Sequence, residues 1–296
     1  MLRDFKNLFI LGSSFGFGFF FCGIFWIANS LTFDPTFKIL IPFSLFLIPL
    51  FLSLFFSIPI VLIGNFCEKN LSSIILVSLA FSFSDFTRSK ILTGFPWNIW
   101  SYSFSWSIES LQILKIIGIF SFNFFAILIF FLPALIFFKN KFKYYLIPIF
   151  IVITFSNYFY GSYNVNSLKQ YPSEKINFKI VSAKVDMTSF KDEESVASKL
   201  IKYSEPNKDV KTVFIWPEGV FLDENFYKNK KIKELFKKNF SENHLIIFGA
   251  NTSKKVLSQH KYFNSMLVSN NNLQFLSKYI KRKLVPFGEF LPFEFI

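Results

Sequence analysis

The chain has 296 residues, of which 52% are hydrophobic and 21% aromatic, and its mean hydropathy is +0.41. This composition excludes an ordinary soluble domain and indicates a membrane protein. The formal net charge is +13, but the lysines are spread along the chain and do not alternate with aromatic residues. We therefore expect the charge to act on anionic lipid, and we predict no nucleic-acid partner. Because Cys22 and Cys67 show neither disulfide nor metal-site spacing, we predict no metal and no cofactor.

Long apolar segments occupy residues 1–160. They cover residues 8–31, 39–63, 72–86, 116–138 and 145–160. The first exceeds the roughly 20 residues that cross a bilayer, and no small-residue cleavage site follows it, which indicates a retained helix. The sequence therefore predicts a bundle of about five transmembrane helices. Basic residues in segments 1–6 and 139–143 predict a cytoplasmic location for both, with the chain after Tyr160 on the opposite side.

An aromatic loop separates the third and fourth apolar segments. It contains Thr93-Gly94-Phe95-Pro96-Trp97 and, further on, Trp100, Tyr102 and Trp106. Tryptophan and tyrosine favour the lipid headgroup layer, because their rings are apolar while their N–H and O–H groups require polar partners. The residues by themselves indicate an interfacial anchor. Before this loop, Asp85 and Arg88 are expected to pair at the membrane boundary, and a role in an entry site is the alternative.

The composition changes after residue 160. Residues 161–175 are rich in Asn, Ser and Tyr and are predicted to be a linker. Alternating apolar residues then predict an α/β domain over residues 176–296. Its predicted strands are 176–185, 210–216, 244–250, 261–269 and 273–279, and its predicted helices are 193–203 and 228–239. The last two strands are predicted to form a hairpin across three asparagines, 270–272.

Two motifs in this domain indicate chemistry. In Val-Phe-Ile-Trp-Pro-Glu-Gly, residues 213–219, an apolar strand stops at a proline and presents Glu218 where open α/β sheets bind their ligands. The second motif, residues 279–292, contains Lys281 and a Pro-Phe-Gly-Glu turn that fixes the direction of Glu289. Taken alone, Glu218 is explained as a solvated surface residue, and Lys281 equally well as part of a charged, solvated strand edge. Their joint presence and order support a functional interpretation.

Trp-Pro-Glu after an apolar strand, Tyr-x-Lys-x-x-Leu-Val-Pro-Phe-Gly-Glu and the upstream Thr-Gly-Phe-Pro-Trp resemble bacterial apolipoprotein N-acyltransferases, whose catalytic domain is a carbon-nitrogen hydrolase (nitrilase) domain. The resemblance implies a membrane helical bundle followed by a partial α/β nitrilase-like (αββα) domain. It implies that a phospholipid acyl chain passes through a cysteine thioester to the amine of the diacylglyceryl-cysteine of an apolipoprotein. It also implies a multi-pass protein of the bacterial inner membrane, with the hydrolase domain on the periplasmic side. For the aromatic loop with Trp97, it implies an alternative to the interfacial anchor, in which the loop helps to shape a lipid-entry site.

Enzymes of this kind use a thiol nucleophile, a carboxylate base and a cation or N–H pair for the oxyanion. The resemblance assigns the base to Glu218, the oxyanion cation to Lys281 and an orienting role to Glu289. We expect Glu218 to be partly desolvated beside Trp216, which would strengthen it as a base. Trp97, Trp216, Tyr262 and Asn264 are the candidate substrate-binding residues, although a strand or hairpin role suits Tyr262 and Asn264 equally well.

The family's nucleophilic cysteine lies downstream of the Pro-Phe-Gly-Glu turn, and this sequence has none there. Cys22 lies in the first apolar segment and Cys67 in a predicted cytoplasmic turn, and neither is expected to reach Glu218. We therefore expect an incomplete acyltransferase with impaired activity. The alternative is a non-catalytic membrane fragment or pseudoenzyme. A transporter is disfavoured because the chain lacks paired half-repeats and mid-membrane charges.

Overall fold

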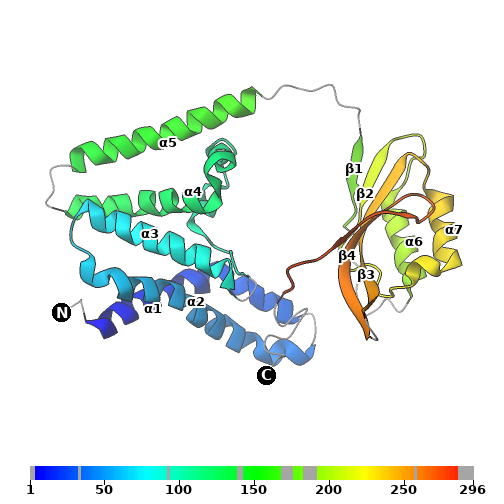
Figure 1. Ribbon diagram of the computed structural model, residues 1–296, viewed down its shortest axis with the longest axis horizontal. Helices are drawn as coiled ribbons and strands as arrows, with labels where there is room; N and C mark the ends of the chain where they lie inside the picture. Colours follow the sequence, from blue (N-terminus) through cyan, green and yellow to red (C-terminus); the bar gives the residue numbers. More distant parts are fainter. Residues whose placement is uncertain are drawn as a thin grey trace. The chain divides into compact units, whose positions relative to one another are not determined.

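The computed structural model describes residues 4–32, 35–91, 94–138, 143–167, 176–182, 192–256 and 259–285. The chain divides into two compact units, residues 1–169 (unit 1) and 170–296 (unit 2). Unit 1 is helical, and unit 2 contains a mixed β-sheet with helices (Figure 1).

Unit 1 is built from long apolar helices. The α-helices are α1 (Phe5–Ile24), α2 (Ile41–Ile63), α3 (Leu71–Arg88), α4 (Leu114–Phe131) and α5 (Lys143–Asn166), and short 3₁₀ segments extend several of them. Four stretches of the described residues are long and apolar enough to cross a membrane: Phe5–Thr32, Pro35–Phe66, Leu71–Arg88 and Ser110–Phe137. These correspond to the first four predicted spans. The fifth is observed as a helix, α5, but it is not among the four, so its crossing of the membrane stays a prediction.

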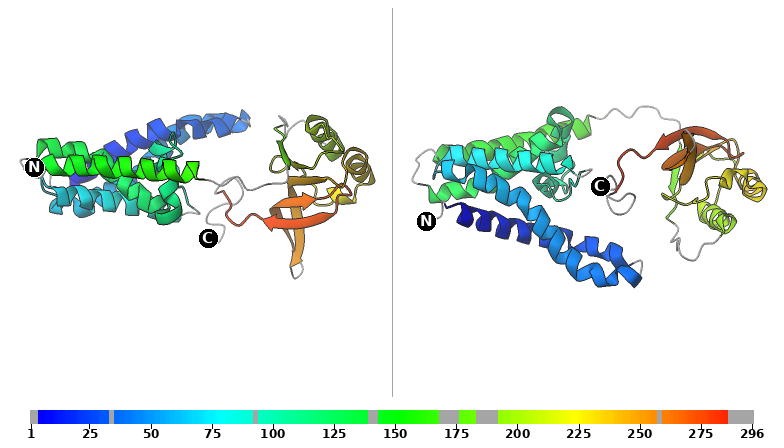
Figure 2. Two further views of the ribbon diagram at one scale, coloured as in Figure 1. Left: turned by 90° about the horizontal axis from the view of Figure 1, so that it is seen from above. Right: turned by 60° about the horizontal axis from the view of Figure 1, so that its bottom comes forward.

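Small residues allow α1 and α2 to pack closely side by side (Figure 2). Gly12 lies against the backbone of Ser57, and a Cβ on Gly16 would lie 2.9 Å from Cα of Ser53. Since Gly12 contacts the later serine and Gly16 the earlier one, the two helices are antiparallel. Close packing of this kind holds membrane helices together because lipid chains provide no hydrophobic force between them.

Serine hydroxyls of α3 make hydrogen bonds to both neighbouring helices. Ser82 Oγ donates to Phe120 O of α4 at 3.0 Å, and Ser84 Oγ donates to Phe55 O of α2 at 2.6 Å. Both carbonyls belong to helices whose outward side chains are apolar and exposed. The serine-rich composition of the third apolar segment therefore reflects contacts between helices.

The sheet of unit 2 has the strand order β1-β2-β3-β4-β5. Its strands are β1 (Asn177–Ile180), β2 (Thr212–Ile215), β3 (His244–Val256), β4 (Gln259–Ser269) and β5 (Phe275–Ile280). The first three are parallel, and β3, β4 and β5 are antiparallel. The connections between the parallel strands contain α6 (Glu193–Ser204) and α7 (Lys230–Asn239), as parallel strands require.

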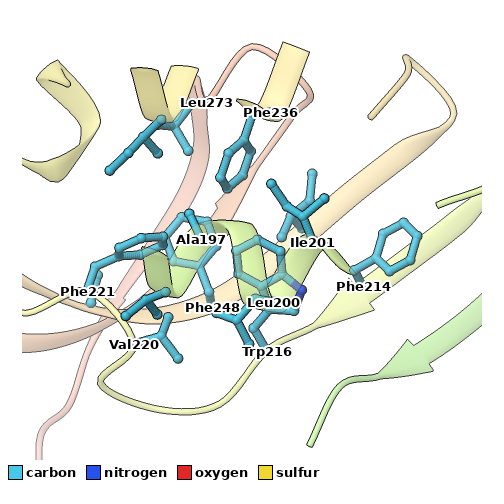
Figure 3. Close-up of a cluster of buried hydrophobic side chains, with 14 of the residues drawn as sticks. Ala197, Leu200, Ile201, Phe214, Trp216, Val220, Phe221, Phe236, Phe248 and Leu273 are labelled. Atoms are coloured by element: carbon cyan, nitrogen blue, oxygen red, sulfur yellow. The ribbon is translucent and has the colours of Figure 1, made fainter. Parts of the chain in front are cut away.

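Both helices cover the same face of this sheet (Figure 2). Each begins at a polar cap: Asp192 accepts from the backbone N–H of Glu194, and Asn229 accepts from that of Lys231. Their apolar faces pack on alternate residues of β2 and β3 (Figure 3). The core residues labelled there are Ala197, Leu200, Ile201, Phe214, Trp216, Val220, Phe221, Phe236, Phe248 and Leu273. In the described part of the chain, the helices and their core thus occupy one face of the sheet.

Most predicted elements of unit 2 are present, with shifted ends. The structure describes β1 as ending at Ile180, and the last part of the predicted strand, from residue 183, lies outside the described residues. Strand β3 continues to Val256, six residues beyond the predicted end, because Asn251 to Val256 pair with Asn264 to Gln259 of β4. The asparagine turn is confirmed, since Asn270 Oδ1 accepts from the backbone N–H groups of Asn272 and Gln274.

The packing of α1 on α2 predicts that Gly12→Val destabilises unit 1. The added side chain would overlap the Ser57 backbone, and overpacking of this kind costs about 1–3 kcal/mol. Gly18→Val is the matched control, because it makes the same change in the same helix where a Cβ meets nothing within 4 Å. Thermal unfolding of the detergent-solubilised chain should show a lower midpoint for Gly12→Val only. Equal midpoints for the two variants would contradict the packing.

Candidate functional site

Glu218 lies where the backbone after β2 leaves the regular parallel ladder. Trp216 N donates to Ile247 O at 2.8 Å, Gly249 N donates to Pro217 O at 3.1 Å, and Val220 N donates to Gly249 O at 3.1 Å. Between them, Gly219 has a φ of 67°, in the left-handed region that glycine tolerates. The proline and this glycine turn the chain so that Glu218 stands at the carboxyl end of β2.

Two polar side chains from neighbouring strands meet the Glu218 carboxylate. Asn264 Nδ2 donates to Glu218 Oε1 at 2.6 Å, and Lys281 Nζ donates to the same oxygen at 3.1 Å. Asn264 lies in β4, and Lys281 directly follows β5, where its backbone N–H donates to Asn264 O at 2.9 Å. The sheet thus brings together an ammonium and a carboxylate that are 63 residues apart in the sequence.

The ion pair is open to solvent. The Glu218 side chain is 63% exposed and that of Lys281 is 30% exposed, so the described residues leave the carboxylate less desolvated than the sequence led us to expect. Exposed ion pairs contribute little to stability. The pair is therefore better suited to meeting a ligand than to holding the fold together.

A hollow of about 360 Å³ lies at this pair. Its lining residues are Ile215, Trp216, Glu218, Ile247, Phe248, Gly249, Asn264, Ser265, Met266, Tyr279 and Lys281. The apolar members come mainly from strands. Of the polar members, Glu218 and Lys281 follow β2 and β5, whereas Asn264 and Ser265 lie within β4. Such a combination of apolar surface and a few convergent polar groups is typical of a ligand site.

Gly249 is the residue that allows this arrangement. A Cβ at position 249 would lie 2.6 Å from Cα of Glu218 and 2.5 Å from N of Gly219. Both are backbone atoms, so a larger residue could not be accommodated by a side-chain movement. Gly249 was not among the residues predicted from the sequence, although a lone glycine inside an apolar strand is a known sign of close backbone approach.

The other candidate residues of unit 2 lie in different environments. Trp216 lines the hollow, but it is only 4% exposed, and its indole Nε1 donates to Ser204 Oγ at 2.9 Å within the core. Tyr262 is opposite Ser253 in the β3–β4 ladder and is 69% exposed. It is not among the residues that line the hollow. Glu289 lies outside the described residues.

Trp97 belongs to unit 1, where its side chain is 51% exposed. Its ring lies edge-on to Trp26 with 5.3 Å between the ring centroids. In the described part of the chain, no group of three or more His, Cys, Asp or Glu side chains is arranged to hold a metal ion.

Known proteins resemble this chain along nearly its whole length. Residues 2–132 match the family model described as the apolipoprotein N-acyltransferase N-terminal domain. A curated apolipoprotein N-acyltransferase of Rickettsia prowazekii is 30% identical over 287 residues, which cover 95% of this chain and 57% of that protein. The corresponding protein of Rickettsia bellii is 31% identical over 304 residues, 98% of this chain and 58% of its own length.

A more distant relative gives the same result. The apolipoprotein N-acyltransferase of Rhizobium rhizogenes is 26% identical over 303 residues, covering 97% of this chain and 56% of that protein. The chain therefore spans a little over half the length of the curated relatives it matches. The family model thus matches most of the helical unit and the relatives match both units, so the chain is similar to apolipoprotein N-acyltransferases along nearly its whole length.

Proposed function

We propose that this chain serves N-acyl transfer from a phospholipid to the diacylglyceryl-cysteine of an apolipoprotein. The observation that supports this proposal best is the convergence of Glu218, Asn264 and Lys281 on one hollow with apolar walls. The carboxylate is suited to accept a proton from a nucleophile. The ammonium is suited to stabilise the negative oxygen that forms when a carbonyl is attacked.

The proposed reaction has two balanced halves. In the first, Glu218 takes the proton of a thiol, the sulfur attacks the acyl ester of the phospholipid, and the C–O bond breaks to give a thioester and a lysophospholipid alcohol that receives the proton. In the second, the free amine of the lipoprotein attacks the thioester, an amide forms, and the thiol is restored. Lys281 Nζ would face the oxyanion in both halves, while Asn264 holds the carboxylate in place.

The thiol is not provided by unit 2, since residues 170–296 contain no cysteine. Cys22 lies in α1, and Cys67 lies between α2 and α3. We therefore assign the base and the cation to this chain and the thiol to polypeptide outside this sequence. The lack of a cysteine in residues 170–296 also favours a second candidate function, a non-catalytic role in the membrane.

We further propose that the protein is a multi-pass protein of the bacterial inner membrane, with unit 2 on the periplasmic side. Two observations support this orientation. Basic residues lie before α1 and between α4 and α5, and these two positions are separated by four apolar stretches, an even number. One more crossing, by α5, would then bring unit 2 to the outside.

The acyl-transfer proposal predicts that the chain can replace the matching part of the Rickettsia prowazekii relative. A chimera of this kind, expressed in bacteria depleted of their own N-acyltransferase, should yield N-acylated lipoprotein detectable by mass spectrometry. Glu218→Gln should lower the rate about 10²–10⁴-fold through loss of the base, and Lys281→Met about 10²–10³-fold through loss of oxyanion stabilisation.

Lys278→Met is the matched control for this experiment. It removes a lysine three residues earlier, from the β5 position that pairs with buried Leu267 on the helix-covered face. The chimera carrying it should acylate at the parent rate. A chimera with Glu218→Gln that is equally active would rule out Glu218 as the base, and an inactive parent chimera would favour the non-catalytic function.

Gly249→Ala is predicted to impair the same chimera without touching a reacting group. The methyl group would push the backbone of Glu218 away from β3, and a displacement of about 1 Å can cost about 10²-fold in rate. Gly18→Ala, at a position with open space, should leave the rate unchanged. Parent-like activity of Gly249→Ala would show that the close approach is not needed.

The orientation predicts opposite labelling of two thiols by a membrane-impermeant maleimide. A Lys278→Cys thiol, at an exposed position of β5, should react in intact spheroplasts. The native Cys67 should react only after lysis, because the turn between α2 and α3 would face the cytoplasm. Labelling of Cys67 alone in intact spheroplasts would indicate the reverse orientation. Labelling of both thiols would place them on the same side of the membrane and exclude this topology.

A further inference from the structure

A buried charged network lies at the end of α3. Arg88 is 1% exposed, and its Nη2 donates to Asp85 Oδ1 at 2.8 Å. The second oxygen of Asp85 accepts from Asn123 Nδ2 of α4 at 2.9 Å. Burying charges is costly unless each is paired and hydrogen-bonded, and here the two charges pair with each other and Asn123 binds the second carboxylate oxygen across two helices.

The network also binds both ends of residues 94–101, the first part of the aromatic loop, called loop 94–101 below. Arg88 Nη1 donates to the backbone carbonyls of Phe95 and Trp97, both at 2.6 Å. At the other end, Ser101 N donates to Asn123 Oδ1 at 2.9 Å. The loop is thus fixed through its backbone by side chains that belong to α3 and α4.

Loop 94–101 contains two residues in the left-handed region of backbone conformation. Gly94 has a φ of 96° and Asn98 a φ of 55°, and glycine and asparagine are the residues that adopt this region most readily. The segment between them presents Trp97, which packs edge-on against Trp26 of the 3₁₀ segment Phe25–Thr32.

The exposed edges of this tryptophan pair suit one kind of occupant. Trp97 is 51% and Trp26 40% exposed, and loop 94–101 follows a candidate membrane span that ends at Arg88. Indole rings beside the end of a span favour the glycerol and headgroup layer of a bilayer. An ordinary interfacial anchor would not require an arginine buried beneath its backbone.

We propose that the Asp85–Arg88–Asn123 network is a positioning device, which fixes the Trp26–Trp97 pair as a docking surface for the glycerol and headgroup region of a phospholipid. This inference rests on the proposed function in one respect: the docked phospholipid is taken to be the proposed acyl donor. It concerns binding alone, so it is testable without acyl transfer. Arg88 acts through the loop backbone and does not itself contact the lipid.

The test uses the full chain in lipid nanodiscs whose phospholipids carry bromine either near the glycerol or near the chain end. Bromine quenches a nearby indole, and the contribution of Trp97 is the difference between the parent and Trp97→Phe. In the parent, quenching of Trp97 by the shallow bromine should exceed quenching by the deep bromine at least about twofold, because the ring would be held at the headgroup layer. With Arg88→Met this ratio should fall towards one.

Two further variants separate positioning from loss of folding. Arg88→Lys keeps a charge for Asp85 but lacks the planar fork that reaches two carbonyls and a carboxylate together. It should preserve thermal stability better than Arg88→Met and still lose the depth preference. Lys90→Met removes a nearby lysine that lies over the Phe86 ring, outside the network, and should leave the ratio unchanged.

The outcomes are distinct. An unchanged ratio in Arg88→Lys and Arg88→Met would overturn the proposal, as would a parent in which neither bromine quenches Trp97. In another outcome, the quenching ratio behaves as expected while the chimera with the Rickettsia prowazekii relative does not acylate lipoprotein. That result would support the docking surface and contradict the acyl-transfer proposal. A lost ratio in Lys90→Met would point to a general effect of charge and would also contradict the network.

Discussion

The register of the β3–β4–β5 ladder is the constraint on which the candidate site depends. It places Asn264 beside Lys281 and both beside the backbone that follows β2. Side chains alternate between the two faces of a strand, so a slip of one residue in β5 would turn Lys281 towards the helix-covered face. The ion pair is too exposed to enforce this register itself. The fold therefore creates the pair, and the pair contributes little to the fold.

Polar groups serve opposite purposes in the two units. In unit 1 the charges of Asp85 and Arg88 are buried and paired with each other, and Arg88 also binds the backbone of a loop among apolar helices. In unit 2 the charges of Glu218 and Lys281 stand at strand ends with part of their surface in solvent. A buried network is costly to rearrange, whereas an open pair can exchange its partners with a ligand. This difference is what a positioning network and a reacting site would each require.

The sequence predicted features that depend on local pattern. Apolar length gave the four candidate spans, alternation gave the sheet, and Trp-Pro-Glu with Tyr-x-Lys indicated two residues that the structure brings together. The sequence did not predict features that depend on contacts with distant backbone. Gly249 lies against the backbone of Glu218 and Gly219, and the last part of β3 forms because it pairs with β4. The fifth predicted span is observed as a helix of 24 residues, α5, and its crossing of the membrane stays a prediction.

An exposed carboxylate is a weak starting point for activating a thiol, and the hollow offers a physical answer to that difficulty. Ile215, Ile247 and Met266 line it beside Glu218, so a bound acyl chain would cover apolar wall and the charged pair together. Removing water from the pair strengthens its interactions with a developing oxyanion. Under the proposed function, the bound lipid would thus itself desolvate the Glu218–Lys281 pair. Water would then compete least for hydrogen bonds to the pair when the substrate is bound.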